Sequence, residues 1–210
     1  MAKIDAFFNL MVEQKASDLH LSSGNPPILR ISGELQRVDY PALENDSLKA
    51  MLYEIAPDIK IKTYEETGDV DFGYEIPKVA RFRCNFFNQK YGVAAVFRQI
   101  PSTVLSFEDF EKFDAPLPPV LKKFPMMHKG LVLVTGPTGS GKSTTLAAMI
   151  DYANKNRHDH ILTVEDPIEF VHQSKGCLVN HREVGMHTKS FASALKGALR
   201  EDPDIILVGE

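Results

Sequence analysis

Several features that would restrict the class of protein are scarce or missing in this sequence of 210 residues. Its two cysteines, Cys84 and Cys177, are far apart and have no neighbouring metal ligands, so a disulfide framework is not expected. No stretch approaches the ~20 apolar residues of a membrane-spanning helix, and the N-terminus lacks the apolar segment of a signal peptide. These absences predict a soluble, cytoplasmic protein.

An excess of basic residues is also missing. The formal net charge is −4 and the pI is near 6.0, so the overall charge does not favour a nucleic acid or an anionic membrane as partner. Apolar residues make up 43% and charged residues 25%, which is ordinary globular usage. The length fits one or two domains with a normal core.

The first hundred residues combine helix and strand patterns. Apolar residues recur at helical spacing between residues 4 and 12, and a second helix is expected over residues 47–55, before Pro57. Alternating polar and apolar residues predict strands over 18–22, 28–31, 34–38, 69–76, 80–88 and 93–100. This order predicts an α+β domain over residues 1–100.

The second half has a different pattern. Four prolines and no glycine between residues 101 and 119 indicate an ordered linker. Continuous apolar runs then predict buried parallel strands over 131–135, 160–164 and 204–209, alternating with helices over 142–156 and 191–199. We therefore expect an α/β domain over residues 120–210. A parallel sheet needs further strands and helices after the third run, so we expect the chain to be truncated at its C-terminus.

A phosphate-binding loop follows the first of these runs. The pattern G-x-x-x-x-G-K-[ST], with a strand before it and a helix after it, predicts binding of ATP or GTP with Mg²⁺. Glycine backbone N–H groups and the helix N-terminus hold phosphate oxygens, a lysine reaches the β- and γ-phosphates and a serine hydroxyl coordinates Mg²⁺. The less favoured reading is a glycine-rich turn with an exposed lysine. The predicted cofactor-binding residues are Gly136, Pro137, Thr138, Gly139, Ser140, Gly141, Lys142, Ser143 and Thr144.

Two acidic elements follow the later strands. The run 205–208 ends in Gly209 and Glu210, which has the form of a Walker B segment, although such segments usually supply an aspartate. Three carboxylates, Glu165, Asp166 and Glu169, follow the strand over 160–164, and ligands bind at the carboxyl ends of strands in α/β sheets. Such carboxylates hold Mg²⁺ through water and orient or deprotonate the attacking water. The alternative is an ordinary charged loop.

Three arginines of the first domain lie on neighbouring predicted strands. Arg81 and Arg83 alternate with apolar residues and so share one face, and Arg98 lies near the end of the next strand. Taken alone, they are solvated cross-strand cations. An enzyme that works as a ring would use such residues as arginine fingers on a neighbour's nucleotide.

Taken together, the motifs resemble those of the secretion-type ATPases, and within them the type IV pilus retraction ATPases. The resemblance covers essentially the whole chain. The segments that carry it are residues 18–21, 80–83, 130–151, 165–169 and 180–185.

The resemblance implies a PAS-like N-terminal domain, a RecA-like ATPase domain and a homo-hexamer with ATP and Mg²⁺ between subunits. It implies that Lys142, Glu165, Glu169 and Glu210 carry catalysis, with Glu169 as the base that activates water. Ser143 and Glu210 would hold Mg²⁺, partly through water. It also implies that Arg83 and Arg98 reach a neighbour's nucleotide in trans.

The function implied is a motor that retracts type IV pili and so drives twitching motility. It would act at the cytoplasmic face of the inner membrane, through a pilus platform protein and without a membrane span of its own. The fragment itself is expected to bind nucleotide without efficient turnover.

Three alternatives remain open. A pilus-extension or type II secretion ATPase shares the chemistry, but such relatives usually carry extra N-terminal domains and a four-cysteine zinc module. A RecA-like nucleic-acid translocase would need a basic groove with stacking aromatics, and the acidic balance argues against it. A non-enzymatic nucleotide sensor would bind without releasing phosphate.

Overall fold

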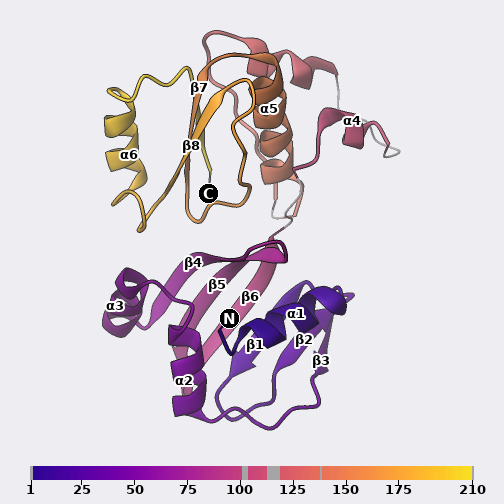
Figure 1. Ribbon diagram of the computed structural model, residues 1–210, viewed down its shortest axis with the longest axis vertical. Coiled ribbons are helices and arrows are strands. Elements are labelled where there is room, and N and C mark those ends of the chain that lie inside the picture. Colours follow the sequence, from indigo (N-terminus) through magenta and orange to yellow (C-terminus); the bar gives the residue numbers. More distant parts are fainter. Residues whose placement is uncertain (1, 101–103, 113–118, 138, 210) are drawn as a thin grey trace. The chain divides into compact units, whose positions relative to one another are not determined.

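The computed structural model describes residues 2–100, 104–112, 119–137 and 139–209 (Figure 1). The chain is mixed α/β and divides into two compact units, Met1–Pro101 and Ser102–Glu210. No helix within the described ranges is long and apolar enough to cross a membrane. Each unit is described by itself below.

The first unit is built on a six-stranded antiparallel sheet in the order β3-β2-β1-β6-β5-β4. Two runs of sequential antiparallel strands, β1 to β3 and β4 to β6, are joined in this sheet by the pairing of β1 with β6. Alternating side chains give each strand one buried face. The strands are β1 (Asp18–Ser22), β2 (Ile28–Ile31), β3 (Glu34–Arg37), β4 (Asp69–Ile76), β5 (Ala80–Gln89) and β6 (Gly92–Ile100). The helices are α1 (Asp5–Glu13), α2 (Asn45–Tyr53) and α3 (Asp58–Thr67).

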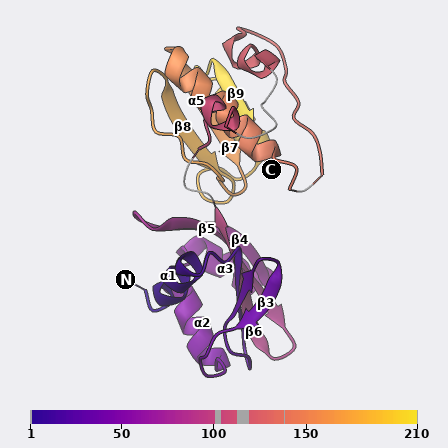
Figure 2. The ribbon, with the colours of Figure 1, turned by 90° about the vertical axis from the view of Figure 1, so that its right-hand side faces the viewer.

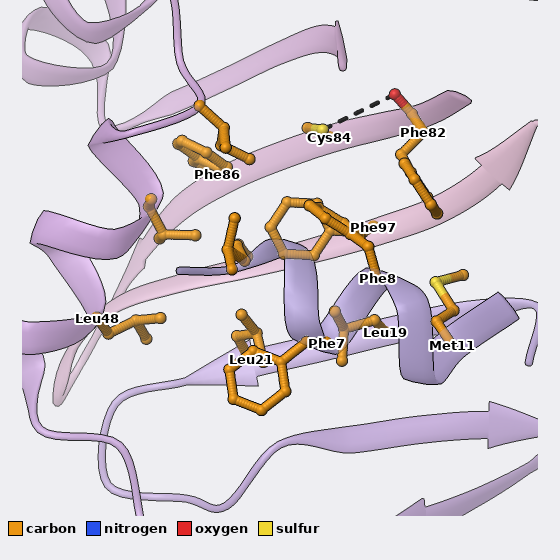
Figure 3. Close-up of a cluster of buried hydrophobic side chains, with 14 of the residues drawn as sticks. Phe7, Phe8, Met11, Leu19, Leu21, Leu48, Phe82, Cys84, Phe86 and Phe97 are labelled. Carbon is orange, nitrogen blue, oxygen red and sulfur yellow. Dashed lines mark hydrogen bonds between the residues drawn. The ribbon is translucent and has the colours of Figure 1, made fainter. Parts of the chain in front are cut away.

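The core of this unit lies between one face of the sheet and its helices. Leu19, Phe97 and Cys84 face one another across β1, β6 and β5, and all three are fully buried. From α1, Phe8 stacks on Phe82 with ring centroids 4.3 Å apart (Figure 3). Complete burial of such a side chain contributes about 1.5–3 kcal/mol. This apolar layer fixes which residues remain on the other face.

The opposite face carries a row of charged side chains. Arg98 lies between Asp18 and Arg83 in the strand register, and Arg30 follows on the other side of Asp18. The Nε of Arg98 donates to Oδ1 of Asp18 at 2.8 Å, and the Asp18 side chain is only 5% exposed. Burial raises the pKa of Asp18, but hydrogen bonds from Ser17 and Arg98 outweigh it and hold the pKa below its usual value.

The second unit contains a three-stranded parallel sheet in the order β8-β7-β9. Helix α5 packs on one face and α6 on the other, as Figure 1 shows, and Figure 2 gives a second view of α5 with the three strands. The strands are β7 (His160–Glu165), β8 (Leu178–Glu183) and β9 (Ile205–Val208). The helices are α4 (Phe107–Phe110), α5 (Lys142–Asn156) and α6 (Phe191–Ala198), with 3₁₀ turns at Pro119–Lys122 and Phe124–Met126.

One predicted strand is wrong. Residues 131–135 are not in a strand, and the side chains of Leu131 and Leu133 are 83% and 75% exposed. An apolar run is buried only where a neighbouring strand and a covering layer are in contact with it. Here the segment and β9 line a cavity of about 400 Å³, and Ile206 and Val208 of β9 are also exposed.

Candidate functional site

The phosphate-binding loop ends at the N-terminus of α5. Gly139 and Gly141 have φ angles of +79° and +87°, which glycine adopts without strain. The carbonyl of Gly141 accepts the N–H of Thr145 at 2.9 Å and so starts the helix. The first N–H groups of a helix have no partner within it, so they are available to an anion. The predicted Thr138 lies outside the described residues.

Lys142 and Ser143 stand on the first turn of α5 and line a cavity of about 180 Å³. The Nζ of Lys142 donates to the carbonyl of Pro137 at 3.3 Å, within the loop itself. Glu165 and Glu169 line the same cavity. The structure therefore brings together four of the residues predicted from two separate motifs, and all belong to the second unit.

Glu165 is the last residue of β7, and it is 7% exposed. Its Oε2 accepts the backbone N–H of Glu169 at 3.2 Å, which closes the acidic loop. Gly209 donates its N–H to Val164 at 2.9 Å, and a Cβ added at Gly209 would lie 2.9 Å from Cγ of Glu165. A side chain at position 209 would therefore force the Glu165 side chain to shift. The predicted Glu210 lies outside the described residues.

A buried carboxylate without a role predicted from the sequence is that of Glu183. It lies opposite Glu165 in the register of β8 and β7 and is 4% exposed. Its Oε2 accepts the N–H of Ile168 at 3.1 Å, so β8 also holds the acidic loop. The three residues before it, Asn180, His181 and Arg182, are polar, so the sequence does not show the pattern of a strand here. The position of Glu183 beside Glu165 follows only from the pairing of β8 with β7.

Two histidines lie near the carboxylates, although the sequence predicts no role for them in the site. His172 lines the cavity, and its ring lies 6.0 Å from that of His181 with an interplanar angle of 14°. Burial, and to a smaller extent repulsion by His181, lower the pKa of His172 to about 4. His172 is therefore neutral at pH 7. Nδ1 of His181 lies 2.8 Å from Oγ1 of Thr163 and 4.0 Å from Oε1 of Glu165.

The chain that returns from the acidic loop is fastened to the far end of α5. The side chain of Asn154, fully buried, donates to the carbonyl of Gln173 at 2.8 Å and accepts the N–H of Lys175 at 3.0 Å. The Nζ of Lys175 lies 2.5 Å from Oδ1 of Asp151, also on α5. Helix α5 thus holds the phosphate-binding loop at one end and this segment at the other.

The predicted arginine fingers, Arg83 and Arg98, lie in the first unit. They face each other across β5 and β6 on the charged face of the sheet. Arg83 contacts Asp71, with Nε 3.4 Å from Oδ1, and both side chains are exposed. Arg98 is 67% exposed, but its Nε is held by the buried Asp18.

The donor set of the cavity fits a nucleoside polyphosphate with Mg²⁺. A helix N-terminus and a lysine offer N–H groups to phosphate oxygens, and the hydroxyl and carboxylates offer the oxygen ligands that Mg²⁺ takes, directly or through water. The segment from Gly139 to Ser143 supplies the first kind of group, and Ser143, Glu165 and Glu169 supply the second. The arrangement can bind phosphate and position a water molecule.

Relatives with known names share these features. The sequence matches, over residues 1–210, the family described as Type II/IV secretion system protein. It is 56% identical over 198 residues to the type IV pilus retraction ATPase PilT of Pseudomonas aeruginosa, covering 94% of this chain and 56% of that protein. A twitching motility protein of Neisseria gonorrhoeae is 48% identical over 209 residues, which are 97% of this chain and 54% of that protein. The chain spans about half the length of these curated relatives.

Two solved ATPase structures are also similar to this chain. The crystal structure of the pilus retraction motor PilT with bound ADP superposes with a TM-score of 0.91 at 44% identity, covering 100% of this chain and 60% of that one. The ATPase DotB of Legionella pneumophila superposes with a TM-score of 0.84 at 28% identity, covering 99% and 58%.

Proposed function

The chain belongs to the type II/IV secretion system protein family, and we propose that it is the nucleotide-binding part of a Mg²⁺-dependent ATPase that retracts type IV pili. Retraction would drive twitching motility. The names of the relatives in Pseudomonas aeruginosa and Neisseria gonorrhoeae support this direction. The observation that carries the proposal is the cavity in which Lys142 and Ser143 meet Glu165 and Glu169.

Each of these residues has a distinct task in ATP hydrolysis. The loop N–H groups and Lys142 bind the β- and γ-phosphates and stabilise the charge that develops on them. Ser143 and Glu210 would hold Mg²⁺, partly through water, and the ion would neutralise further charge on the phosphate oxygens. Glu169 orients the attacking water and accepts its proton, while Glu165 holds the acidic loop through the Glu169 N–H.

The assembly belongs to the proposal as well. The first unit would be a PAS-like domain, the second part of a RecA-like domain, and six copies would form a ring. Arg98 and Arg83 would reach the nucleotide of a neighbouring subunit. Because Arg98 binds Asp18 through Nε, both terminal guanidinium nitrogens of Arg98 could donate to a phosphate. The ring would act on a pilus platform protein at the cytoplasmic face of the inner membrane.

The test is ATP turnover by the full-length protein and by its Lys142→Ala and Glu169→Gln variants. Each substitution is expected to lower kcat by about 10²-fold or more, because each residue acts on charge or proton transfer in the transition state. The exposed Lys129, substituted by alanine, is a matched control for loss of one lysine. Turnover at the wild-type rate in the Lys142 variant would contradict the proposal, and binding without phosphate release in the wild type would indicate a nucleotide sensor.

The direction of the motor needs a separate experiment. A strain that lacks the protein is expected to keep its surface pili and to lose twitching, because pili would extend without retracting. Loss of surface pili would instead identify an extension ATPase, and loss of protein secretion a type II secretion ATPase.

A further inference from the structure

We propose that His181 is a positioning residue that fixes the orientation of the Glu165 carboxylate, through its contacts with Thr163 and the backbone of His172. This inference rests on the proposed ATPase function. It concerns a residue on the second, mostly polar strand of the sheet, which neither the phosphate-binding loop nor the acidic loop contains.

Strand register places His181 beside the site. In the parallel pair of β7 and β8, Thr163 lies opposite His181 and Glu165 opposite Glu183. Residues two apart on a strand point to the same face, so Thr163, Glu165 and His181 share the face that packs on α5. His181 therefore lies beside Thr163, which lines the cavity, and two residues before the level of Glu165.

Both ring nitrogens of His181 are in contact with polar groups. Nε2 lies 3.1 Å from the backbone nitrogen of His172 and 3.2 Å from its carbonyl oxygen. Nδ1 lies 2.8 Å from Oγ1 of Thr163, whose hydroxyl can donate or accept. Nδ1 also lies 4.0 Å from Oε1 of Glu165, so this edge of the ring borders the carboxylate.

The Glu165 side chain is confined on its other sides. Gly209 lies close to Cγ of Glu165 on one side, since an added Cβ there would be 2.9 Å from that atom. Oε2 of Glu165 accepts the backbone N–H of Glu169. His181 supplies the contact near Oε1, and its side chain is 15% exposed against 10% for that of Glu165. Since these groups are largely shielded from water, a lost contact is not replaced by solvent in the same geometry. The orientation of Glu165, and with it the position of Glu169, then depends on His181.

The experiment compares His181→Leu with His181→Gln in the full-length protein. Leucine fills the space without polar contacts, whereas the glutamine amide carries one donor and one acceptor, as the neutral imidazole does. We expect kcat for ATP to fall roughly tenfold in His181→Leu and to stay within about threefold of wild type in His181→Gln. KM for ATP and the Kd for ADP are expected to be unchanged in both, because the phosphate-binding loop is untouched.

Thr163→Val tests the same contact without touching the ring. Valine has nearly the shape of threonine, so the fold is preserved while the hydroxyl partner of Nδ1 is removed. We expect kcat to fall in this variant too, and the double variant with His181→Leu to be no slower than the slower single one, since residues that act as a unit are not additive. His158→Leu, at an exposed histidine outside the cavity, is the matched control.

The outcomes separate the two proposals. Absence of ATP turnover in the wild type removes the ATPase function and this inference with it. Normal turnover in the wild type together with unchanged kcat in His181→Leu overturns this inference alone. Should His181→Leu fail to fold, Thr163→Val decides, and an unchanged kcat there overturns it. Equal loss of kcat in the leucine and glutamine variants, or a weaker Kd for ADP, would indicate a purely structural role.

Discussion

The two units use opposite means to hold their sheets. In the first unit a continuous apolar layer, with Phe8, Phe82 and Phe97 at its centre, fills one face of the sheet. In the second unit the apolar clusters on the two faces are small, and buried polar groups such as Glu183 and Asn154 fix the loops. We therefore expect substitutions in the apolar layer of the first unit to lower its stability. We expect substitutions of the buried polar groups in the second unit to change the geometry of the site.

The largest effect is expected from emptying the apolar layer. Phe8→Ala removes a fully buried ring and should lower the free energy of unfolding of the first unit by about 4 kcal/mol. Chemical denaturation measures this loss, and Tyr91→Ala, at a residue 70% exposed, is the control. An equal loss in both variants would break the comparison, because it would mean that the apolar layer is not what holds this sheet.

A smaller effect concerns pH and the second unit. The folded chain keeps His172 neutral down to a pKa of about 4, whereas the unfolded chain protonates it near 6.5. Between these values the unfolded state binds the extra proton, so stability is fully present above pH 6.5 and falls as the pH drops, by about 3 kcal/mol at pH 4. Denaturation at pH 7.5 and pH 5 should show that His172→Gln reduces this loss. The exposed His158, changed to Gln, should leave it as in the wild type.

The smallest effect should appear in activity rather than stability. Gly209→Ala places a Cβ 2.9 Å from Cγ of Glu165, and the glutamate must move by a fraction of an ångström. We expect kcat for ATP to fall on the order of tenfold, about 1.4 kcal/mol in activation free energy, with ADP binding unchanged. Gly197→Ala, at a helical glycine of α6 whose added Cβ would meet only the flexible side-chain ends of Glu201 and Arg182, is the control for an added methyl group. Unchanged kcat in Gly209→Ala would show that the contact between residue 209 and Glu165 does not control activity. Geometry in the second unit would then depend on its other buried polar groups.

The sequence predicts most of the first unit because alternation there is clear. Strands β4, β5 and β6 follow their predicted ranges within a residue. Helix α3 is missed, since Ile59 is exposed while the polar Lys60 is buried, which erases its amphipathic pattern. Local patterns describe half-buried sheets well and describe short helices poorly when charged side chains bury their aliphatic stems.

Part of the candidate site could also be predicted from the sequence, and part could not. The spacing of the phosphate-binding loop predicts Lys142 and Ser143 directly, and the rule on strand ends brings Glu165 and Glu169 near them. His181 and Glu183 could not be found this way, because their strand is polar and its register against β7 is a tertiary property. The apolar run over 131–135 misleads for the converse reason, since hydrophobicity alone does not supply a partner strand.

The fastening of Asn154 has a mechanical consequence. Helix α5 and the segment around residues 173–175 are joined by two opposed hydrogen bonds from one buried amide, so they resist being pulled apart and resist sliding. A movement of the C-terminal end of α5 would therefore have to carry this segment with it or break both hydrogen bonds. Since the same helix begins at the phosphate-binding loop, the loop and the segment around residues 173–175 are tied to one element.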